Sequence, residues 1–322
     1  MADRSLDAIA DADGRLAVLA MDQRATLRRM LDSAGMPSSD EDLSAFKIDV
    51  VRALAPLSTG VLLDPDFGVE PVCAAGALPD GVGLLVAAEP LDRAKPVDPA
   101  TWDGEAGRIV DPVRGARFVL DLGGDALKFL IQWRPGLTAG AGEPDLAQEA
   151  LRATATVIAD CDREGMPSVI EPLIGRLANE PPFTPEVAGP IVIESATRMA
   201  QLGPDLLKLE WPGGAEGCRA VTGALGPVPW ALLSAGVAFE AFVDRVRVAL
   251  DAGAVGFIAG RAIWGEAVGL AGAERTTFLA EVAVPRLATL RDVLDEHGRS
   301  WREVAGTAGA LAGARAADRG GS

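Results

Sequence analysis

Eight short apolar runs recur along the chain and alternate with stretches of helical spacing, and this alternation limits the possible folds more than any other feature. The runs do not alternate polar and apolar residues, so they fit parallel strands covered on both faces. Eight such strands, each followed by a helix, predict an α/β fold of the closed, single-domain (β/α)8 type rather than an open doubly wound sheet. The runs cover residues 16–22, 59–64, 83–89, 126–133, 167–174, 206–212, 230–236 and 254–261.

The intervening stretches contain helices with recognisable ends. The clearest helices are expected at residues 145–164, 184–202, 239–252 and 275–296. Glycines stand where helix C-caps should fall, at Gly35, Gly165, Gly203 and Gly253. We therefore assign residues 1–303 to one barrel domain and expect residues 304–322, rich in Ala, Gly and Arg, to form a mobile tail.

The charge of the chain excludes several classes of partner. A formal net charge of −16 argues against a nucleic-acid footprint and against an anionic membrane surface, because both need a basic patch. The sequence shows no signal-peptide pattern and no apolar stretch long enough to span a bilayer. The three cysteines, Cys73, Cys161 and Cys218, are widely separated and odd in number, which favours packing roles in the reducing cytoplasm.

Lysine is rare and unusually placed. The chain has only four lysines against 26 arginines, and Lys47, Lys128 and Lys208 all lie inside apolar stretches. A lysine amine can lose its proton and attack a carbonyl group, which a guanidinium cannot do. This placement predicts an enzyme that forms a Schiff base.

The residues that are missing narrow the chemistry further. The chain has no tyrosine, and its one histidine, His297, lies in a polar segment before Gly298, as expected for the end of a helix. A Ser-His-Asp triad or a His-ligated zinc site is therefore excluded from the core motifs. Acid–base work must fall to carboxylates and lysine.

Polar side chains stand at or just after the carboxyl end of seven apolar runs. In a (β/α)8 barrel this end forms the face that carries chemistry. An alternative reading is that each strand simply ends at its first polar residue. The set consists of Asp22, Asp64, Glu89, Glu171, Glu210, Ser234 and Arg261.

Two of the buried lysines are expected to converge. Lys208 and Glu210 are two residues apart, so both should face the barrel interior, and Lys128 occupies a similar position in another strand. A neighbouring cation and partial burial both favour a neutral amine, which Schiff-base formation requires. The alternative is that each lysine is held in a structural ion pair, such as Lys208 with Glu210.

An anion site is indicated at the last two strands. The segments Ser234-Ala235-Gly236 and Gly260-Arg261 place small residues where backbone amides can approach a phosphate, and Arg261 can add a bidentate contact. Tight packing between strand and helix is the alternative explanation for these small residues.

Taken together, these segments resemble the class I aldolases that include tagatose 1,6-bisphosphate aldolase and sulfofructose 1-phosphate aldolase. The resemblance extends from Leu16 to Glu296, with the motifs in the same order. The segments are Asp22-Gln23-Arg24, Phe46-Lys47, Leu63-Asp64-Pro65, Leu127-Lys128-Phe129, Ile170-Glu171-Pro172, Lys208-Leu209-Glu210, Ser234-Ala235-Gly236 and Gly260-Arg261-Ala262.

The resemblance implies a carbon–carbon lyase that needs neither metal nor cofactor and cleaves a phosphorylated ketose through a Schiff base on Lys208. It further implies that Glu171 shuttles a proton and that Lys128 and Asp22 contact the groups being cleaved. The remaining substrate-binding candidates are Ser234, Gly236, Gly260 and Arg261 at the phosphate, Gln23 and Arg24 at the distal anion, and Asp64 and Glu210 elsewhere in the site.

The substrate implied by the resemblance divides between two branches. The stretch through Gln132 and Arg134 is more similar to the sulfosugar enzymes, which favours 6-deoxy-6-sulfofructose 1-phosphate cleaved to dihydroxyacetone phosphate and sulfolactaldehyde. The segments around Asp64 and Gly236 look more like the tagatose 1,6-bisphosphate enzymes, whose aldehyde product is glyceraldehyde 3-phosphate.

Two functions outside this class stay open at this stage. Asp64, Asp66 and Glu89 could bind Mg²⁺ in a metal-dependent lyase, or the barrel could bind a sugar phosphate without turning it over. A homo-oligomer, dimer or tetramer, is expected because soluble enzymes commonly form closed assemblies. Lys47 is expected to be either catalytic support or a structural charge.

Overall fold

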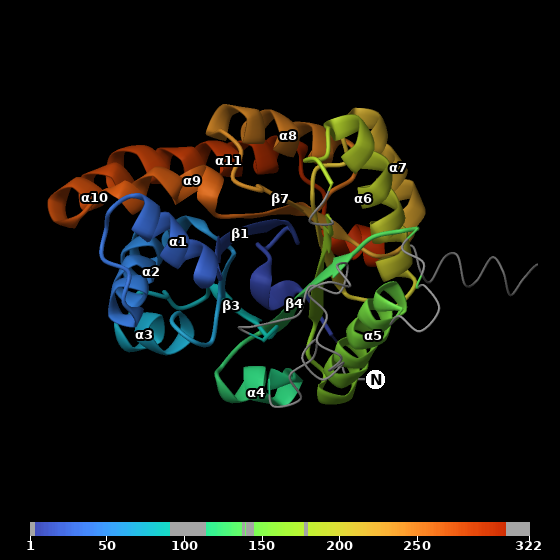
Figure 1. Cartoon of the computed structure of the whole chain (residues 1–322), viewed down its shortest axis with the longest axis horizontal. Coiled ribbons are helices and arrows are strands. Elements are labelled where there is room, and N and C mark those ends of the chain that lie inside the picture. Colours follow the sequence, from blue (N-terminus) through green and yellow to red (C-terminus); the bar gives the residue numbers. More distant parts are fainter. Residues whose placement is uncertain (1–3, 91–113, 137–138, 140–144, 177–179, 307–322) are drawn as a thin grey trace, which may run out of the picture.

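The computed structural model describes residues 4–90, 114–136, 139, 145–176 and 180–306. Eight parallel strands close into a barrel in sequence order, with β1 paired to β8, and helices surround them (Figure 1). The predicted (β/α)8 barrel is confirmed. The strands are β1 Leu16–Met21, β2 Gly60–Leu63, β3 Gly83–Ala87, β4 Ala126–Trp133, β5 Ser168–Ile174, β6 Leu206–Leu209, β7 Trp230–Leu233 and β8 Gly256–Ala259.

The helices begin and end largely where local chemistry predicts. Ser39 and Asp42 form a reciprocal capping box that starts α2, and Gly165, with φ of 71°, ends α5 in the left-handed conformation that favours glycine. The helices are α1 Ala25–Ser33, α2 Asp40–Leu54, α3 Val69–Ala74, α4 Ala116–Asp121, α5 Leu146–Glu164, α6 Pro185–Ala200, α7 Ala215–Leu225, α8 Phe239–Asp251, α9 Arg261–Trp264, α10 Gly272–Phe278 and α11 Val284–His297.

The C-terminal helical region differs from its prediction. The helix expected at residues 275–296 is divided into α10 and α11 by a π-helical turn at Leu279–Ala283. His297 ends α11 before Gly298, as predicted. Residues 301–306 are helical, so the predicted domain boundary after residue 303 falls within a helix, and residues 307–322 lie outside the described residues.

Several strands are shorter than the apolar runs that predicted them. The sixth and seventh strands were expected to reach residues 212 and 236 but end at Leu209 and Leu233. Pro212 has no N–H to give to a strand ladder, and Gly236 adopts φ of 75°, which an extended strand does not contain. The polar residues after both strands therefore belong to loops at the barrel mouth.

Apolar side chains fill the barrel interior and its amino-terminal end, so polar groups lie at the carboxyl-terminal end. Leu127, Phe129 and Ile131 of β4 point outward and pack with the helices, as their alternation predicted. Leu6 and Ile9 pack with the inward-facing apolar side chains of the strands and close the amino-terminal end of the barrel. The charged side chains therefore gather at the opposite, carboxyl-terminal end. No helix in the described part of the chain combines the length and the apolarity needed to cross a bilayer.

Candidate active site

Lys128 is the electrostatic centre of the barrel mouth. It points inward from β4 and is fully buried, and its Nζ lies 2.8 Å from Asp22, 2.9 Å from Glu89 and 2.9 Å from Glu171. Burial alone would lower the pKa of Lys128, but the three carboxylates outweigh it and raise the pKa above its ordinary value. Lys128 is therefore a permanent cation in this site.

Lys208 meets the same carboxylate from β6. Its Nζ lies 3.0 Å from Glu171 Oε2, the oxygen that also contacts Lys128. Neither contact is aligned as a hydrogen bond, so both are ion pairs. The predicted convergence of the two lysines is confirmed. The alternative that paired Lys208 with Glu210 was wrong about the partner, because Glu171 of the neighbouring strand β5 takes that place.

The two lysines differ in how firmly they are held. Lys128 has three carboxylate partners, whereas Lys208 shares one carboxylate with Lys128 and lines the cavity at the barrel mouth. Burial would raise the pKa of Asp22, but the charges of Lys128 and Lys208 lower it, so Asp22 stays ionised. Lys208 thus combines access to the cavity with an ion pair to a single carboxylate, Glu171.

Glu210 lies beyond Lys208, at the end of β6, and lines the same cavity. The N–H of Ile174 donates to its Oε2 at 2.8 Å. Burial raises the pKa of Glu210 to about 7, and this rise is opposed by the Ile174 hydrogen bond and supported by the negative charge of Glu171. Near neutral pH this carboxyl group can both donate and accept a proton.

Part of the cavity lining suits a phosphate group. Ser234, Gly260 and Arg261 line it, as predicted. A Cβ on Gly260 would collide with the carbonyl oxygen of Ala20, so only glycine fits between β8 and β1. Gly236 is not among the lining residues but lies against the Arg261 guanidinium. Arg261 forms no ion pair with a described residue, which leaves its charge for a ligand.

The residues predicted for the distal anion differ from the sequence prediction. Gln23 and Arg24 line the cavity, but the Arg24 guanidinium is already engaged, 3.0 Å from Asp66 and 3.5 Å from Glu89. Arg29 of α1 also lines the cavity, donates to the Thr26 hydroxyl at 3.1 Å and forms no ion pair with a described residue. Sequence reasoning missed Arg29, because its direction depends on how α1 packs on the barrel.

The structure does not bring Asp64 to the cavity. Asp64 is fully buried beside Lys47, with 2.7 Å between Lys47 Nζ and Asp64 Oδ2. Lys47 also donates to the carbonyl oxygens of Met21 and Gln23, at 2.7 and 2.8 Å. The expectation that Asp64 binds substrate is therefore corrected. The Lys47–Asp64 pair instead fixes the backbone on both sides of Asp22.

The carboxylates proposed for Mg²⁺ are occupied by basic side chains. Asp64 pairs with Lys47, Asp66 pairs with Arg24 and Arg114, and Glu89 pairs with Lys128. Within the described ranges, no three His, Cys, Asp or Glu side chains are grouped so that they could hold a metal ion. The geometry thus gives the magnesium hypothesis no support.

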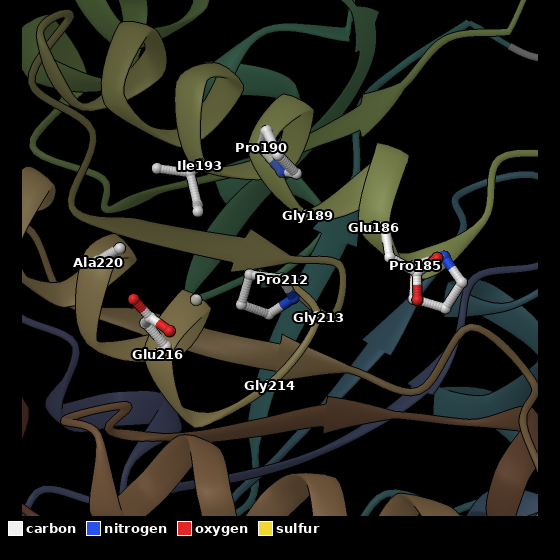
Figure 2. Close-up of a pocket in the computed structure, with 11 residues that line it drawn as sticks. Pro185, Glu186, Gly189, Pro190, Ile193, Pro212, Gly213, Gly214, Glu216 and Ala220 are labelled. Atoms are coloured by element: carbon white, nitrogen blue, oxygen red, sulfur yellow. The ribbon is translucent and has the colours of Figure 1, made fainter.

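The cavity that holds this chemistry has a volume of about 540 Å³. A second cavity of about 400 Å³ lies between α6, α7 and the loop after β6 (Figure 2). Glycine and proline make up most of its lining, and its ionisable groups among the described residues are Glu186 and Glu216. With two carboxylates and no basic group in this lining, the second cavity does not suit an anionic ligand.

The sequence of the chain is similar to those of known aldolases. A model of the DeoC/LacD aldolase family matches residues 16–266. A tagatose 1,6-diphosphate aldolase of Listeria monocytogenes is 26% identical over 92% of each chain, and one of Streptococcus agalactiae is 25% identical over 93% of this chain and 97% of its own.

Solved structures share the fold. An archaeal fructose 1,6-bisphosphate aldolase superposes with a TM-score of 0.59 at 18% identity, covering 89% of this chain and 96% of its own. A fructose-bisphosphate aldolase from Slackia heliotrinireducens gives a TM-score of 0.57 at 17% identity, covering 90% of this chain and 86% of its own. At these identities the likeness concerns the barrel architecture.

Proposed function

Since the chain belongs to the DeoC/LacD family of aldolases, which are carbon–carbon lyases, we propose that it cleaves a ketose 1-phosphate between C3 and C4 through a Schiff base on Lys208. The observation that carries this proposal is the meeting of Lys208 and Lys128 at one oxygen of Glu171, inside a cavity of sugar-phosphate size. A site that only bound its ligand would not require a second, less firmly held amine at this position.

The proposed reaction begins when the neutral amine of Lys208 attacks the C2 carbonyl of the ketose. Loss of water gives an iminium, which withdraws electrons from the C3–C4 bond and so supplies the electron sink without a metal or cofactor. Glu171 removes the proton of the C4 hydroxyl as the bond breaks. Lys128 and Asp22 hold the neighbouring oxygens of the substrate, and a three-carbon aldehyde departs.

Arg261 is expected to contribute to phosphate binding. Arg261→Gln should raise the KM for dihydroxyacetone phosphate, measured in the condensation direction, by about 10- to 100-fold, the range expected for losing a charge-assisted contact. Unphosphorylated dihydroxyacetone is the matched control, because it makes no phosphate contact. An equal loss with both donors would show that Arg261 supports the structure rather than the phosphate.

The side chains expected around the distal group favour a singly charged group there. Arg24 is already paired with Asp66 and Glu89, so Arg29, which forms no ion pair with a described residue, supplies the available positive charge beside the neutral Gln23 and Thr26. A sulfonate carries one negative charge, whereas a phosphate ester carries about −1.5 to −2 at neutral pH. We therefore favour 6-deoxy-6-sulfofructose 1-phosphate, cleaved to dihydroxyacetone phosphate and sulfolactaldehyde.

Tagatose 1,6-bisphosphate is the second candidate substrate, because curated relatives carry the name tagatose 1,6-diphosphate aldolase. Its cleavage would give dihydroxyacetone phosphate and glyceraldehyde 3-phosphate. The two candidates differ only in the group at the distal end and in the sugar's stereochemistry. The residues near the distal group are therefore the place to test the choice.

Comparison of kcat/KM for the two substrates tests this choice. We expect the sulfonate to be preferred by at least about tenfold, which corresponds to about 1.4 kcal/mol of transition-state stabilisation. Arg29→Met should lower kcat/KM for both substrates, because either distal anion loses its cation. A tenfold preference for tagatose 1,6-bisphosphate would overturn the sulfosugar assignment and leave the aldolase proposal in place.

The expected assembly and location complete the proposal. We propose a cytoplasmic homo-oligomer, dimer or tetramer, acting on a small phosphorylated ketose, in line with the cysteine usage and acidic charge of the chain. Light scattering of the purified protein would measure the assembly directly, and a monomeric mass would contradict it.

A further inference from the structure

The proposed cycle moves protons at two different places on the substrate. At C4 and C3, a base takes the hydroxyl proton during cleavage, and an acid then protonates the enamine carbon. At C2, an acid must protonate the carbinolamine hydroxyl before water can leave, and a base must later deprotonate the water that hydrolyses the iminium. In the proposed function, Glu171 carries out the proton transfers at C4 and C3.

Glu171 is already engaged at the first place. Its Oε2 is in contact with two amines, Lys128 at 2.9 Å and Lys208 at 3.0 Å, so this oxygen faces cationic groups. A carboxyl group without such partners is the better candidate for the proton transfers at C2.

Glu210 has the position that this second group requires. It is the first residue after β6, two residues beyond Lys208. Both line the cavity. The C2 atom of the substrate is bonded to Lys208 Nζ in the intermediate, so the C2 oxygen lies in the cavity that both side chains line.

The hydrogen bonding of Glu210 leaves one of its oxygens available. Oε2 accepts from the N–H of Ile174 at 2.8 Å, which fixes the carboxyl group on the rim of the cavity. Oε1 receives no hydrogen bond from a described residue, and Glu210 is only partly buried. None of the described basic side chains forms an ion pair with Glu210, in contrast to Asp22, Glu89 and Glu171.

We propose that Glu210 is the acid that protonates the carbinolamine hydroxyl at C2 and the base that takes a proton from water when the iminium is hydrolysed. The proposal rests on the proposed Schiff-base function. In the forward step the Glu210 proton moves to the hydroxyl oxygen, the C2–O bond breaks and water leaves, while the nitrogen lone pair of Lys208 forms the C=N bond. The products are the iminium, water and the Glu210 carboxylate, and hydrolysis reverses each transfer.

The electrostatic surroundings of Glu210 support both roles near neutral pH. Burial and the charge of Glu171 on β5 raise its pKa to about 7, against the opposing hydrogen bond from Ile174. The protonated form needed to expel water is therefore lost as pH rises through about 7. The other ionisable groups lining the cavity are Asp22, Arg24, Arg29, Glu89, Lys208 and Arg261.

The rate of iminium formation tests the proposal. Dihydroxyacetone phosphate is mixed with enzyme, the reaction is quenched with borohydride at increasing times, and the reduced adduct is counted by intact-protein mass spectrometry. Glu210→Gln should slow adduct formation by about 10²- to 10⁴-fold, the usual contribution of a general acid, while the final trapped fraction stays as in the wild type. Glu210→Asp keeps a carboxyl group on a shorter side chain. Its rate of adduct formation should lie between the rates of Glu210→Gln and the wild type. The matched control is Glu194→Gln, an exposed glutamate of α6.

The pH profile supplies a second readout that a structural role would not move. The wild-type rate of iminium formation should have a descending limb with its midpoint near pH 7, and Glu210→Gln should lack this limb. An unchanged rate and an unchanged profile in Glu210→Gln would overturn the proposal for Glu210 alone. The absence of any adduct in the wild-type enzyme would instead overturn the proposed Schiff-base function.

Discussion

Replacement of Lys208 by arginine should abolish aldol cleavage, lowering kcat by on the order of 10⁵-fold or more, the scale on which the loss of a covalent nucleophile acts. Arginine keeps the positive charge near Glu171 but cannot form an imine with a ketone. The measurement is the steady-state rate of dihydroxyacetone phosphate release, together with borohydride trapping, which should give no adduct in this variant.

Retention of charge makes this substitution informative. A loss of activity in Lys208→Arg cannot be assigned to a missing cation, because the guanidinium can still pair with Glu171 across the 3.0 Å contact that Lys208 makes. Far-UV circular dichroism would establish that the barrel is intact. Activity within tenfold of the wild type would mean that Lys208 is not the nucleophile. It would also contradict the proposed Schiff-base reaction.

Replacement of Lys47 by methionine should lower the free energy of unfolding by about 3–5 kcal/mol, because removing one partner of a buried ion pair leaves an uncompensated charge. Both Lys47 and Asp64 are fully buried, 2.7 Å apart. The same substitution removes the contacts from Lys47 to the carbonyls of Met21 and Gln23. Urea denaturation followed by circular dichroism measures the change.

A second variant separates the buried charge from simple loss of packing. Lys47→Met combined with Asp64→Asn should recover more than half of the lost stability, since the amide oxygen of asparagine can still accept from the N–H groups of Asp66 and Phe67. If the double variant is as unstable as the sum of the single ones, the ion pair is not the cause. Arg117→Met, which removes one partner of the exposed pair with Asp121, is the control and should change stability by less than about 1 kcal/mol.

The fold could be predicted from the sequence because its main signal is local. Continuous apolar runs identify strands that are covered on both faces, and the alternation with helices closes at eight. The ends of the strands were less accurate. The sequence predicted that the sixth and seventh strands extend to Pro212 and Gly236. Both strands end earlier, because Pro212 has no N–H for the strand hydrogen bonds and Gly236 has a positive φ.

Most of the site could also be located from residue type and position. Of the seven residues at strand ends, Asp64 alone does not line the cavity. Which partner each side chain meets was not predictable, because contacts between strands depend on register and twist. Lys208 therefore meets Glu171 of β5 rather than its own neighbour Glu210, and Lys47 reaches the first strand from α2.

Trapping of the intermediate would test the mechanism at its defining step. The wild-type enzyme is incubated with dihydroxyacetone phosphate and a metal chelator, reduced with borohydride, and digested for peptide mass mapping. We expect a single reduced adduct on the peptide that contains Lys208, formed despite the chelator. An adduct on the Lys128 peptide, or no adduct together with activity that appears only on addition of Mg²⁺, would contradict the Schiff-base assignment.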